Sequence, residues 1–254
     1  MLEKDLDKLR SLRIGLALSG GSVRGLAHIG VIKALTEIGL NPSVIAGTSV
    51  GSLVGVSIAA GMEWHEIAEM ARSVFWPELL NGARLERFCE KHLPKTFTEL
   101  ELPFAAVATL LPEKQAIAIK TGRLASAINA SCAIRFLRRP VIREGQKLKD
   151  GGMACVLPAL ACRELGADFV IASDVWTLSF VLKQIGCKPE NNLNGKLYPL
   201  HYRQAIENTQ MLVQPQIPAI GYLPSDAAIK RMISIGEQAT YKALSNYLTS
   251  KRSS

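Results

Sequence analysis

The stretch that decides the fold reads RIGLALSGGSVRGLAHIGVIKAL at residues 13–35 and VIAGTSVGSLVG at residues 44–55. Each part begins with a short apolar run, passes through a glycine-containing turn and continues with the spacing of a buried helix. This order predicts strand, turn and helix twice in succession. Such units are typical of a parallel sheet that helices cover on both faces. We therefore expect an α/β fold.

The apolar pattern continues to alternate between strand and helix along the rest of the chain. We expect strands at 13–18, 44–46, 104–109, 115–120 and 169–175, and helices at 26–38, 52–60, 64–75, 82–92, 154–165 and 225–248, the last with Ser225 or Asp226 as its N-cap. We treat residues 1–254 as one domain with a charged N-terminal extension over 1–12, which fits a short solvated helix. Prolines, glycines and asparagines over 178–224 predict irregular structure there, where a lid fits.

Composition excludes several classes of protein. The chain has 254 residues, of which 48% are hydrophobic and 20% charged, too apolar for a disordered chain. It carries 30 Lys and Arg against 22 Asp and Glu, a net charge of +8 that favours anionic surfaces. Few aromatic residues accompany these cations, so we expect no nucleic-acid partner. Five cysteines without a CxxC pair and an N-terminus without an apolar signal segment favour the cytoplasm.

A membrane span is the alternative interpretation of residues 37–63. The 25 residues between Glu37 and Glu63 include no charged side chain, and Gly47, Gly51 and Gly55 recur at the spacing of a transmembrane helix interface. Turn-forming residues at 39–43 shorten the apolar stretch, however, and what remains is poor in leucine. The composition favours a turn, a buried strand and a helix of small residues in a soluble fold.

Two glycine-rich turns can carry chemistry. Gly47–Gly51 fits G-x-S-x-G at a strand-to-helix junction, which exposes the Ser49 hydroxyl as a nucleophile and offers the N–H of Val50 to an oxyanion. The turn at 20–25 opens the next predicted helix, so its N–H groups can converge on an anion. It lacks the third glycine of the dinucleotide motif and the lysine of a P-loop, which argues against nucleotide binding.

A serine nucleophile needs a base. Among the four histidines only His201 follows the chain order of α/β-hydrolases, and its neighbours predict a surface loop. Asp150, followed by Gly151 and Gly152, is the stronger candidate, because a buried aspartate can accept the serine proton directly. An Asp-Gly-Gly sequence taken alone is usually only a turn.

Four ordered segments together resemble the patatin-like phospholipases: Ser19–Leu35, Gly47–Gly55, Ala130–Ile134 and Lys149–Gly152. The similarity spans about residues 12–248 and is weakest over 176–202. It implies a three-layer α/β/α fold with a mostly parallel central sheet, and an acyl hydrolase of phospholipids or lysophospholipids with a Ser–Asp dyad.

The resemblance also implies site residues. The dyad is Ser49 and Asp150, and the segment for the oxyanion contains Gly20, Gly21, Ser22 and Arg24. No metal and no cofactor is needed. The chain departs from the family where Arg135 replaces the usual proline and where 153–158 lacks Asn-Pro, which leaves the shape of the acyl pocket open.

The cations near Asp150 suggest a peripheral contact with the membrane. We expect a patch that draws the site onto anionic lipid, formed by Arg135, Arg138, Arg139 and Arg143. The alternative is that these residues only form a solvated basic face without a partner. For the whole protein, the alternative is a lipid-binding or regulatory member of the same fold without catalysis, against which the intact Ser49 and Asp150 argue.

Overall fold

The computed structural model describes residues 2–134, 136–176, 199–218, 221 and 223–251. The strands are β1 (Ile14–Leu18), β2 (Val44–Thr48), β3 (Phe104–Leu111), β4 (Gln115–Ile119), β5 (Val141–Arg143), β6 (Gln146–Asp150), β7 (Phe169–Ser173) and β8 (Met211–Val213). The α-helices are α1 (Leu2–Arg10), α2 (Leu26–Ile38), α3 (Val50–Ala59), α4 (Trp64–Ser73), α5 (Gly82–His92), α6 (Leu124–Ser131), α7 (Ala159–Glu164), α10 (Leu200–Glu207) and α11 (Asp226–Ser250). Short 3₁₀ turns are η1 (Ser22–Gly25), η2 (Trp76–Leu80), η3 (Phe97–Glu99) and η4 (Gly151–Met153).

Within these residues the strands form one eight-stranded sheet in the order β5-β6-β3-β2-β1-β7-β8, with β4 also paired to β3. The run from β3 to β8 is parallel, whereas β4, β5 and β6 are antiparallel additions at one end. The expected mostly parallel sheet is therefore confirmed, with a mixed end.

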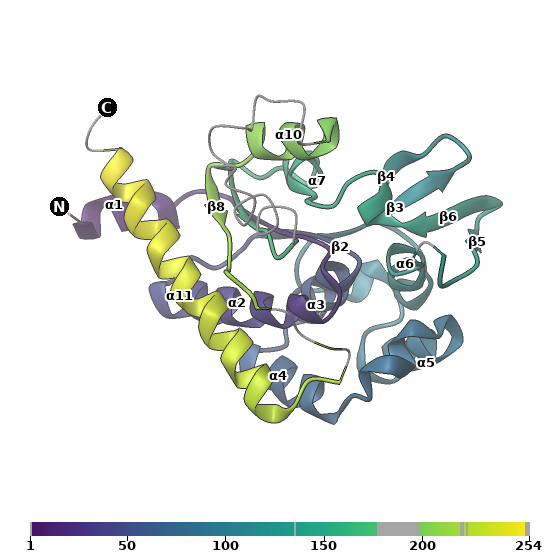
Figure 1. Cartoon of the computed structure of the whole chain (residues 1–254). Helices are drawn as coiled ribbons and strands as arrows, with labels where there is room; N and C mark the ends of the chain where they lie inside the picture. The colour runs from purple at the N-terminus through teal and green to yellow at the C-terminus, as the bar shows by residue number, and fades with distance from the viewer. Residues whose placement is uncertain (1, 135, 177–198, 219–220, 222, 252–254) are drawn as a thin grey trace.

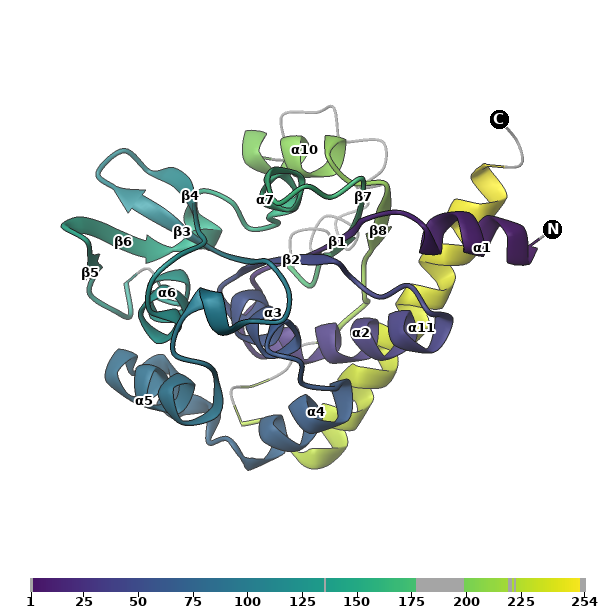
Figure 2. The same cartoon turned by 180° about the vertical axis from the view of Figure 1, so that it is seen from behind.

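Helices cover both faces of the sheet (Figures 1 and 2). The views show α7 and α10 on one side, and α2, α3, α4 and α11 on the other. Alternate residues of β1 explain this arrangement: Ile14, Leu16 and Leu18 pack into the core under α2 and α11, while Ala17 joins the second core under α7. A strand buried on both faces needs the continuous apolar run that β1 shows.

Most expected elements lie where the sequence places them, and the differences have local causes. The helix expected at 154–165 begins only at Ala159, because Pro158 is its N-cap and 151–153 forms a 3₁₀ turn. Part of the segment expected to be irregular is regular: α10 and β8 lie within 178–224. Residues 177–198, the centre of the expected lid, lie outside the described residues.

The described part of 178–224 is fixed to the sheet by a buried hydrogen-bond network. Asp174, just after β7, accepts from the hydroxyl of Tyr202 on α10 at 2.6 Å and from Gln214 Nε2 at 3.1 Å. Burial raises the pKa of Asp174, and the Tyr202 hydrogen bond opposes that rise. These hydrogen bonds therefore hold α10 and the segment after β8 at the C-terminal end of β7.

The N-terminal extension is a helix, as expected, but it is not merely solvated. Leu6 and Leu9 of α1 are buried in the larger core. Arg10 donates to the carbonyl of Ile38 at 2.8 Å, which ties α1 to the end of α2.

Residues 37–63 do not form a membrane span. They contain β2 and the ten-residue α3, both in the core of the sheet structure. Among the described helices, none combines the length and the apolar character needed to cross a membrane.

Candidate active site

Ser49 lies in a sharp turn between β2 and α3. Its backbone has φ 53° and ψ −125°, outside the regions that non-glycine residues prefer. The turn needs two glycines beside it: a Cβ at Gly47 would lie 2.3 Å from the carbonyl of Gly51, and one at Gly51 would lie 2.2 Å from the carbonyl of Leu18. Strain of this kind persists only where the surrounding structure enforces it, and it is frequent at active sites.

The sheet brings Asp150 to Ser49. Thr48 of β2 pairs with Val107 of β3, and Asp150 at the end of β6 pairs with Ala108, the next residue of β3. One edge of β3 is paired with β4. The other edge is paired first with β2 and then, further along, with β6. Their ends therefore meet, and the two predicted dyad residues are neighbours although they are 101 positions apart.

The environment of Asp150 makes its carboxyl more basic. The residue is 9% exposed, and burial raises its pKa above the ordinary value for aspartate. A side-chain hydrogen bond with Ser49, the N–H of Gly152 at 2.8 Å from Oδ1 and the charges of Arg138 and Lys149 oppose that rise. Burial is the largest of these influences, so the net shift is upward. A more basic carboxylate is a better acceptor for a hydroxyl proton.

Ser131 is a part of the site that sequence reasoning missed. It ends α6, and its hydroxyl accepts the backbone N–H of Ser49 at 2.9 Å while donating to the carbonyl of Val107 at 2.6 Å. The segment Ala130–Ile134 carries part of the family resemblance, but the sequence gives no sign of which backbone group the hydroxyl meets. On the opposite side, the hydroxyl of Ser52 donates to the carbonyl of Ser49 at 2.6 Å.

The expected oxyanion donors divide into two groups. The N–H of Gly20 donates to the carbonyl of Val156 at 2.9 Å, and that of Arg24 to the carbonyl of Gly21 at 3.3 Å. These two backbone donors are already used, which corrects the expectation for them. Ser22 and Val50 are the first residues of η1 and α3, where an N–H has no partner within its own helix.

Gly21 completes the second group. In the described part of the chain its N–H donates to no acceptor. Ser22 and Val50 line the same pocket as Ser49. Within the described residues, the backbone N–H groups of Gly21, Ser22 and Val50 are therefore without an acceptor.

An apolar pocket begins beside Ser49. Its walls are mainly aliphatic and aromatic, and its lining residues are Ser22, Val23, Ser49, Val50, Leu53, Trp76, Leu79, Leu80, Leu85, Cys132 and Ile134. Trp76 is fixed there by a hydrogen bond from Nε1 to the carbonyl of Ala71 at 3.1 Å. Burial raises the pKa of the Cys132 thiol to about 12, so this cysteine stays protonated and does not compete as a nucleophile. Sequence reasoning did not place Cys132 in the site.

Neither His201 nor His28 joins Ser49. His201 lies on α10 rather than on the expected loop, and in the described residues it makes no hydrogen bond to Ser49 or Asp150. His28 is fully buried, and burial lowers its pKa to about 4. Its Nε2 lies 3.0 Å from the carbonyl of Ser19 and must donate there, so Nδ1 accepts the Ser173 hydroxyl at 2.8 Å. This neutral histidine braces the ends of β1 and β7.

The expected basic patch does not form one solvent-facing surface. Arg143 is buried and donates to the carbonyl of Thr121. Arg138 turns inward to the carbonyl of Cys132 at 2.9 Å, near enough to Asp150 for its charge to lower that carboxyl's pKa. Arg139 is exposed, and Arg135 lies outside the described residues. Arg138 and Arg143 are therefore corrected from lipid-facing cations to structural ones.

Comparison with known proteins places this geometry in context. The chain is 37% identical over 177 residues to an uncharacterized NTE family protein of Mycobacterium bovis. The alignment covers 64% of this chain and 49% of that protein. It is 32% identical over 181 residues to human patatin-like phospholipase domain-containing protein 6, covering 64% of this chain and 13% of that one. The chain therefore spans about half, or much less, of these relatives. A lysophospholipase of Mycosarcoma maydis is 30% identical over 190 residues, 67% of this chain and 10% of its own.

Solved structures share the fold at low sequence identity. VipD from Legionella pneumophila superposes with a TM-score of 0.64 at 14% identity, over 92% of this chain and 67% of that one. Human GIVD cytosolic phospholipase A2 superposes with a TM-score of 0.52 at 12% identity, over 96% of this chain and 63% of its own.

Comparison with a family model identifies the family as well as the fold. Residues 16–163, more than half of the chain, match the model described as patatin-like phospholipase. Both glycine-rich turns, Ser49 and Asp150 fall within the matched segment. The chain belongs to the patatin-like phospholipase family.

Proposed function

We propose that this protein is a serine acyl hydrolase that cleaves fatty-acyl esters of phospholipids or lysophospholipids. The observation that carries the proposal is the pairing of Ser49, strained at φ 53°, with the buried Asp150 at the mouth of an apolar pocket. Family membership and the similarity to a lysophospholipase support the substrate class.

In the first half of the reaction, Asp150 takes the proton of the Ser49 hydroxyl as Oγ attacks the ester carbonyl carbon. The carbonyl oxygen becomes an oxyanion, which the N–H groups of Gly21, Ser22 and Val50 stabilise. The carbon–oxygen bond to the leaving alcohol then breaks, and Asp150 returns the proton to that alcohol. An acyl group remains esterified to Ser49.

In the second half, Asp150 accepts a proton from water, whose oxygen attacks the acyl carbonyl. Collapse of this second oxyanion breaks the bond to Ser49 Oγ, which recovers the proton from Asp150. The products are a free fatty acid and the restored enzyme, and no metal or cofactor takes part in these steps.

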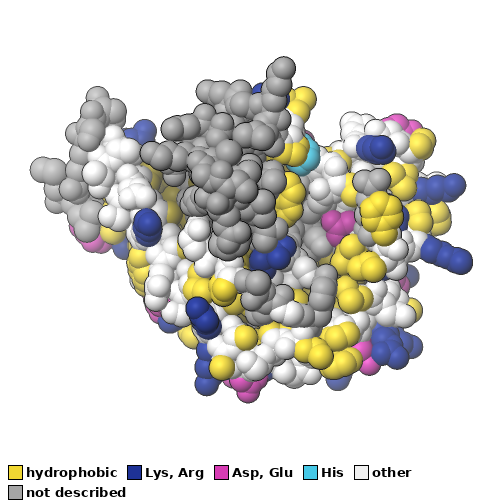
Figure 3. All heavy atoms as spheres, in the orientation of Figure 1, with side chains coloured by type: hydrophobic (Ala, Val, Ile, Leu, Met, Phe, Trp, Pro, Cys, Tyr) yellow, Lys and Arg dark blue, Asp and Glu magenta, His cyan; other side chains and the backbone are white. Residues whose placement is uncertain are grey.

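The proposed contact with a lipid surface rests on apolar rather than basic side chains. Phe136 is 88% exposed and Leu137 63% exposed, two and three positions after the pocket residue Ile134. On the β5-β6 hairpin, Ile142 is 62% exposed and pairs in register with Lys147. Figure 3 shows exposed apolar side chains gathered where Figure 1 places α6. Aromatic and aliphatic side chains with nearby cations are typical of peripheral membrane contacts.

The test compares hydrolysis of p-nitrophenyl butyrate, p-nitrophenyl laurate and a lysophospholipid by the wild type and by Ser49→Ala. Ser245→Ala, on the exposed side of α11, is the matched control. We expect Ser49→Ala to lose at least about a thousandfold in kcat and the control to lose nothing. Equal, negligible rates in all three proteins would favour the alternative, a lipid-binding member of the fold without catalysis.

A further inference from the structure

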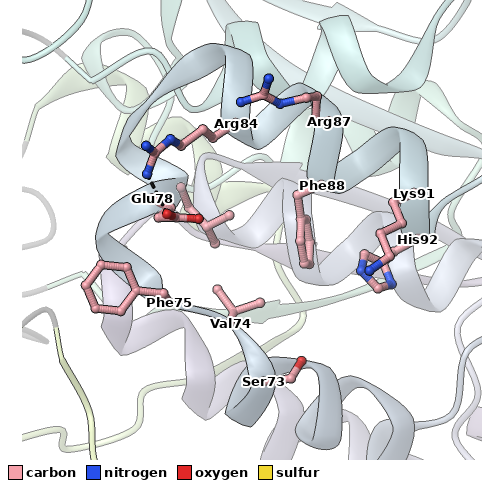
Figure 4. Close-up of a pocket in the computed structure, with 10 residues that line it drawn as sticks. Ser73, Val74, Phe75, Glu78, Arg84, Arg87, Phe88, Lys91 and His92 are labelled. Atoms are coloured by element: carbon pink, nitrogen blue, oxygen red, sulfur yellow. Dashed lines mark hydrogen bonds and ion pairs between the residues drawn. The ribbon is translucent and has the colours of Figure 1, made fainter.

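A basin lies between α5 and the segment that joins α4 to η2 (Figure 4), and Ser49 is not among the residues that line it. It has a volume of about 640 Å³ and is lined by Ser73, Val74, Phe75, Glu78, Leu79, Arg84, Arg87, Phe88, Lys91 and His92. This is within the usual size of a pocket for a small organic ligand. We call it the α5 basin.

One wall of the α5 basin is cationic. Arg84, Arg87 and Lys91 are on one face of α5, since residues three and four apart share a face of a helix. The carboxylate of Glu78, the one acidic side chain among the described lining residues, is paired with Arg84 at 2.5 Å. Figure 4 shows this pair on one side of the basin and Lys91 on the other.

Arg87 and Lys91 are not neutralised by the carboxylates on their own helix. Glu86 accepts a hydrogen bond from Asn129 at 2.6 Å, and Glu90 pairs with Arg123 at 2.5 Å. Within the described residues neither Arg87 nor Lys91 forms an ion pair. The basin therefore presents two uncommitted positive charges.

The floor of the α5 basin is apolar and continues inward. Val74, Leu79 and Phe88 line both the basin and an inner apolar pocket beneath α4. That inner pocket shares Leu53, Trp76 and Leu79 with the pocket beside Ser49. A continuous row of apolar side chains therefore connects the pocket beside Ser49 to the α5 basin.

A hollow with an apolar floor and two free cations at its rim matches a molecule with an alkyl chain and one anionic end. We propose that the α5 basin binds a free long-chain fatty acid, with its carboxylate at the cationic rim to which Arg87 and Lys91 belong and its alkyl chain over Val74, Leu79 and Phe88. That this acid is also a product of the enzyme rests on the proposed function; the binding itself does not.

The test measures displacement of the fluorescent fatty acid cis-parinaric acid by competing ligands in phosphate-free buffer. Laurate should compete, octanoate should compete less well by up to about fourfold per missing methylene, and acetate should not compete. Arg87→Gln/Lys91→Gln should weaken laurate about five- to tenfold, because two exposed charge contacts are lost, and should leave dodecan-1-ol unaffected. The matched control Lys4→Gln/Lys8→Gln removes two exposed cations at the same spacing on α1 and should bind laurate as the wild type does.

Three results would overturn the proposal. Unchanged laurate affinity in the double variant would place the acid elsewhere, for instance beside Ser49. Displacement by inorganic phosphate as strong as that by laurate would make the basin a simple anion site. Dodecan-1-ol binding to the wild type as tightly as laurate would remove any role for the cations. The same measurements on Ser49→Ala separate this inference from the proposed function, since binding there needs no turnover.

Discussion

The hydroxyl of Ser131 accepts the backbone N–H of Ser49 at 2.9 Å. It also donates to the carbonyl of Val107 at 2.6 Å, so one buried side chain joins the strained turn after β2 to the central strand β3. The first N–H groups of a helix such as α3 have no partner within the helix. Ser49 immediately precedes α3, and Ser131 supplies the acceptor for its N–H. The backbone position of the proposed nucleophile therefore depends on a residue at the end of α6.

We predict that Ser131→Ala lowers kcat on a soluble ester by about tenfold or more while KM changes little. The variant leaves the Ser49 N–H without its partner and removes the hydrogen bond from Ser131 to the Val107 carbonyl in a buried site, which costs about 1–3 kcal/mol of stability. The strained turn can then relax and move Oγ relative to Asp150. Steady-state kinetics and thermal unfolding measure the two effects.

A matched control separates positioning from stability. Thr240 is fully buried in α11, and its hydroxyl donates to the carbonyl of Gly236 at 2.9 Å, far along the chain from the dyad. Thr240→Val should lose stability without a specific loss of kcat. If both variants lose kcat in proportion to stability, Ser131 has only a structural role.

Asp150→Asn should abolish most activity and stabilise the fold at neutral pH. Loss of a general base typically costs about 10²–10⁴ in rate. Because burial raises the pKa of Asp150 in the folded state, the folded protein holds this proton more tightly than the unfolded one. Asp150 therefore opposes folding increasingly as pH rises through its folded pKa, and asparagine removes that penalty while its oxygen can still accept from Gly152. Thermal unfolding at a pH below the ordinary aspartate pKa of about 3.9 and at pH 8 should show the larger gain at pH 8.

The wild-type pH profile tests the same carboxyl by kinetics. Activity requires ionised Asp150, so kcat/KM should rise with pH through an acidic limb above the ordinary aspartate pKa of about 3.9. The limb should lie there in His201→Ala as well, with most activity retained. A limb near pH 6.5 that disappears in His201→Ala would identify a histidine as the base.

The sequence predicts those parts of the site that depend on local pattern. The apolar run of β1, the turn at Gly47–Gly51 and the helix of small residues after it are local signals, and they place Ser49 correctly on a strand-to-helix turn. The residues alone offer Asp150 as a candidate base, but its pairing with Ser49 required the family resemblance, because the end-to-end meeting of β2 and β6 along β3 is a property of sheet register. No local pattern encodes which strands share an edge.

Other features were beyond sequence reasoning for a different physical reason. Arg138 and Arg143 have the same local character as Arg139, yet tertiary contacts turn the first two inward and leave the third in solvent. Likewise, the N–H of Gly20 donates to the carbonyl of Val156, which lies 136 residues further along the chain. Charge and motif define which groups exist, whereas long-range packing decides which of them remain available.

Gly51→Ala should destabilise the protein and reduce activity together. A Cβ there would lie 2.2 Å from the carbonyl of Leu18 and 2.6 Å from that of Ser19, so the backbone of β1 or α3 must shift. Overpacking of this kind typically costs about 1–3 kcal/mol. Thermal unfolding and ester turnover measure the effect. Gly221→Ala is the control, since a Cβ at Gly221 meets no atom of the described residues within 4 Å; similar losses in both variants would contradict the packing argument.

Phe136→Ser/Leu137→Ser should lower activity on phospholipid vesicles about tenfold and leave turnover of p-nitrophenyl butyrate unchanged. Both side chains are mostly exposed next to the pocket residue Ile134, and insertion of part of their apolar surface into a bilayer contributes about 1–2 kcal/mol. The control Leu160→Ser/Leu200→Ser removes two exposed leucines from α7 and α10, on the opposite face of the sheet, and should leave both activities unchanged. Equal losses on vesicles and on the soluble ester would mean that Phe136 and Leu137 shape the pocket. Equal vesicle losses in the control would mean that general hydrophobicity, not this surface, governs the contact with lipid.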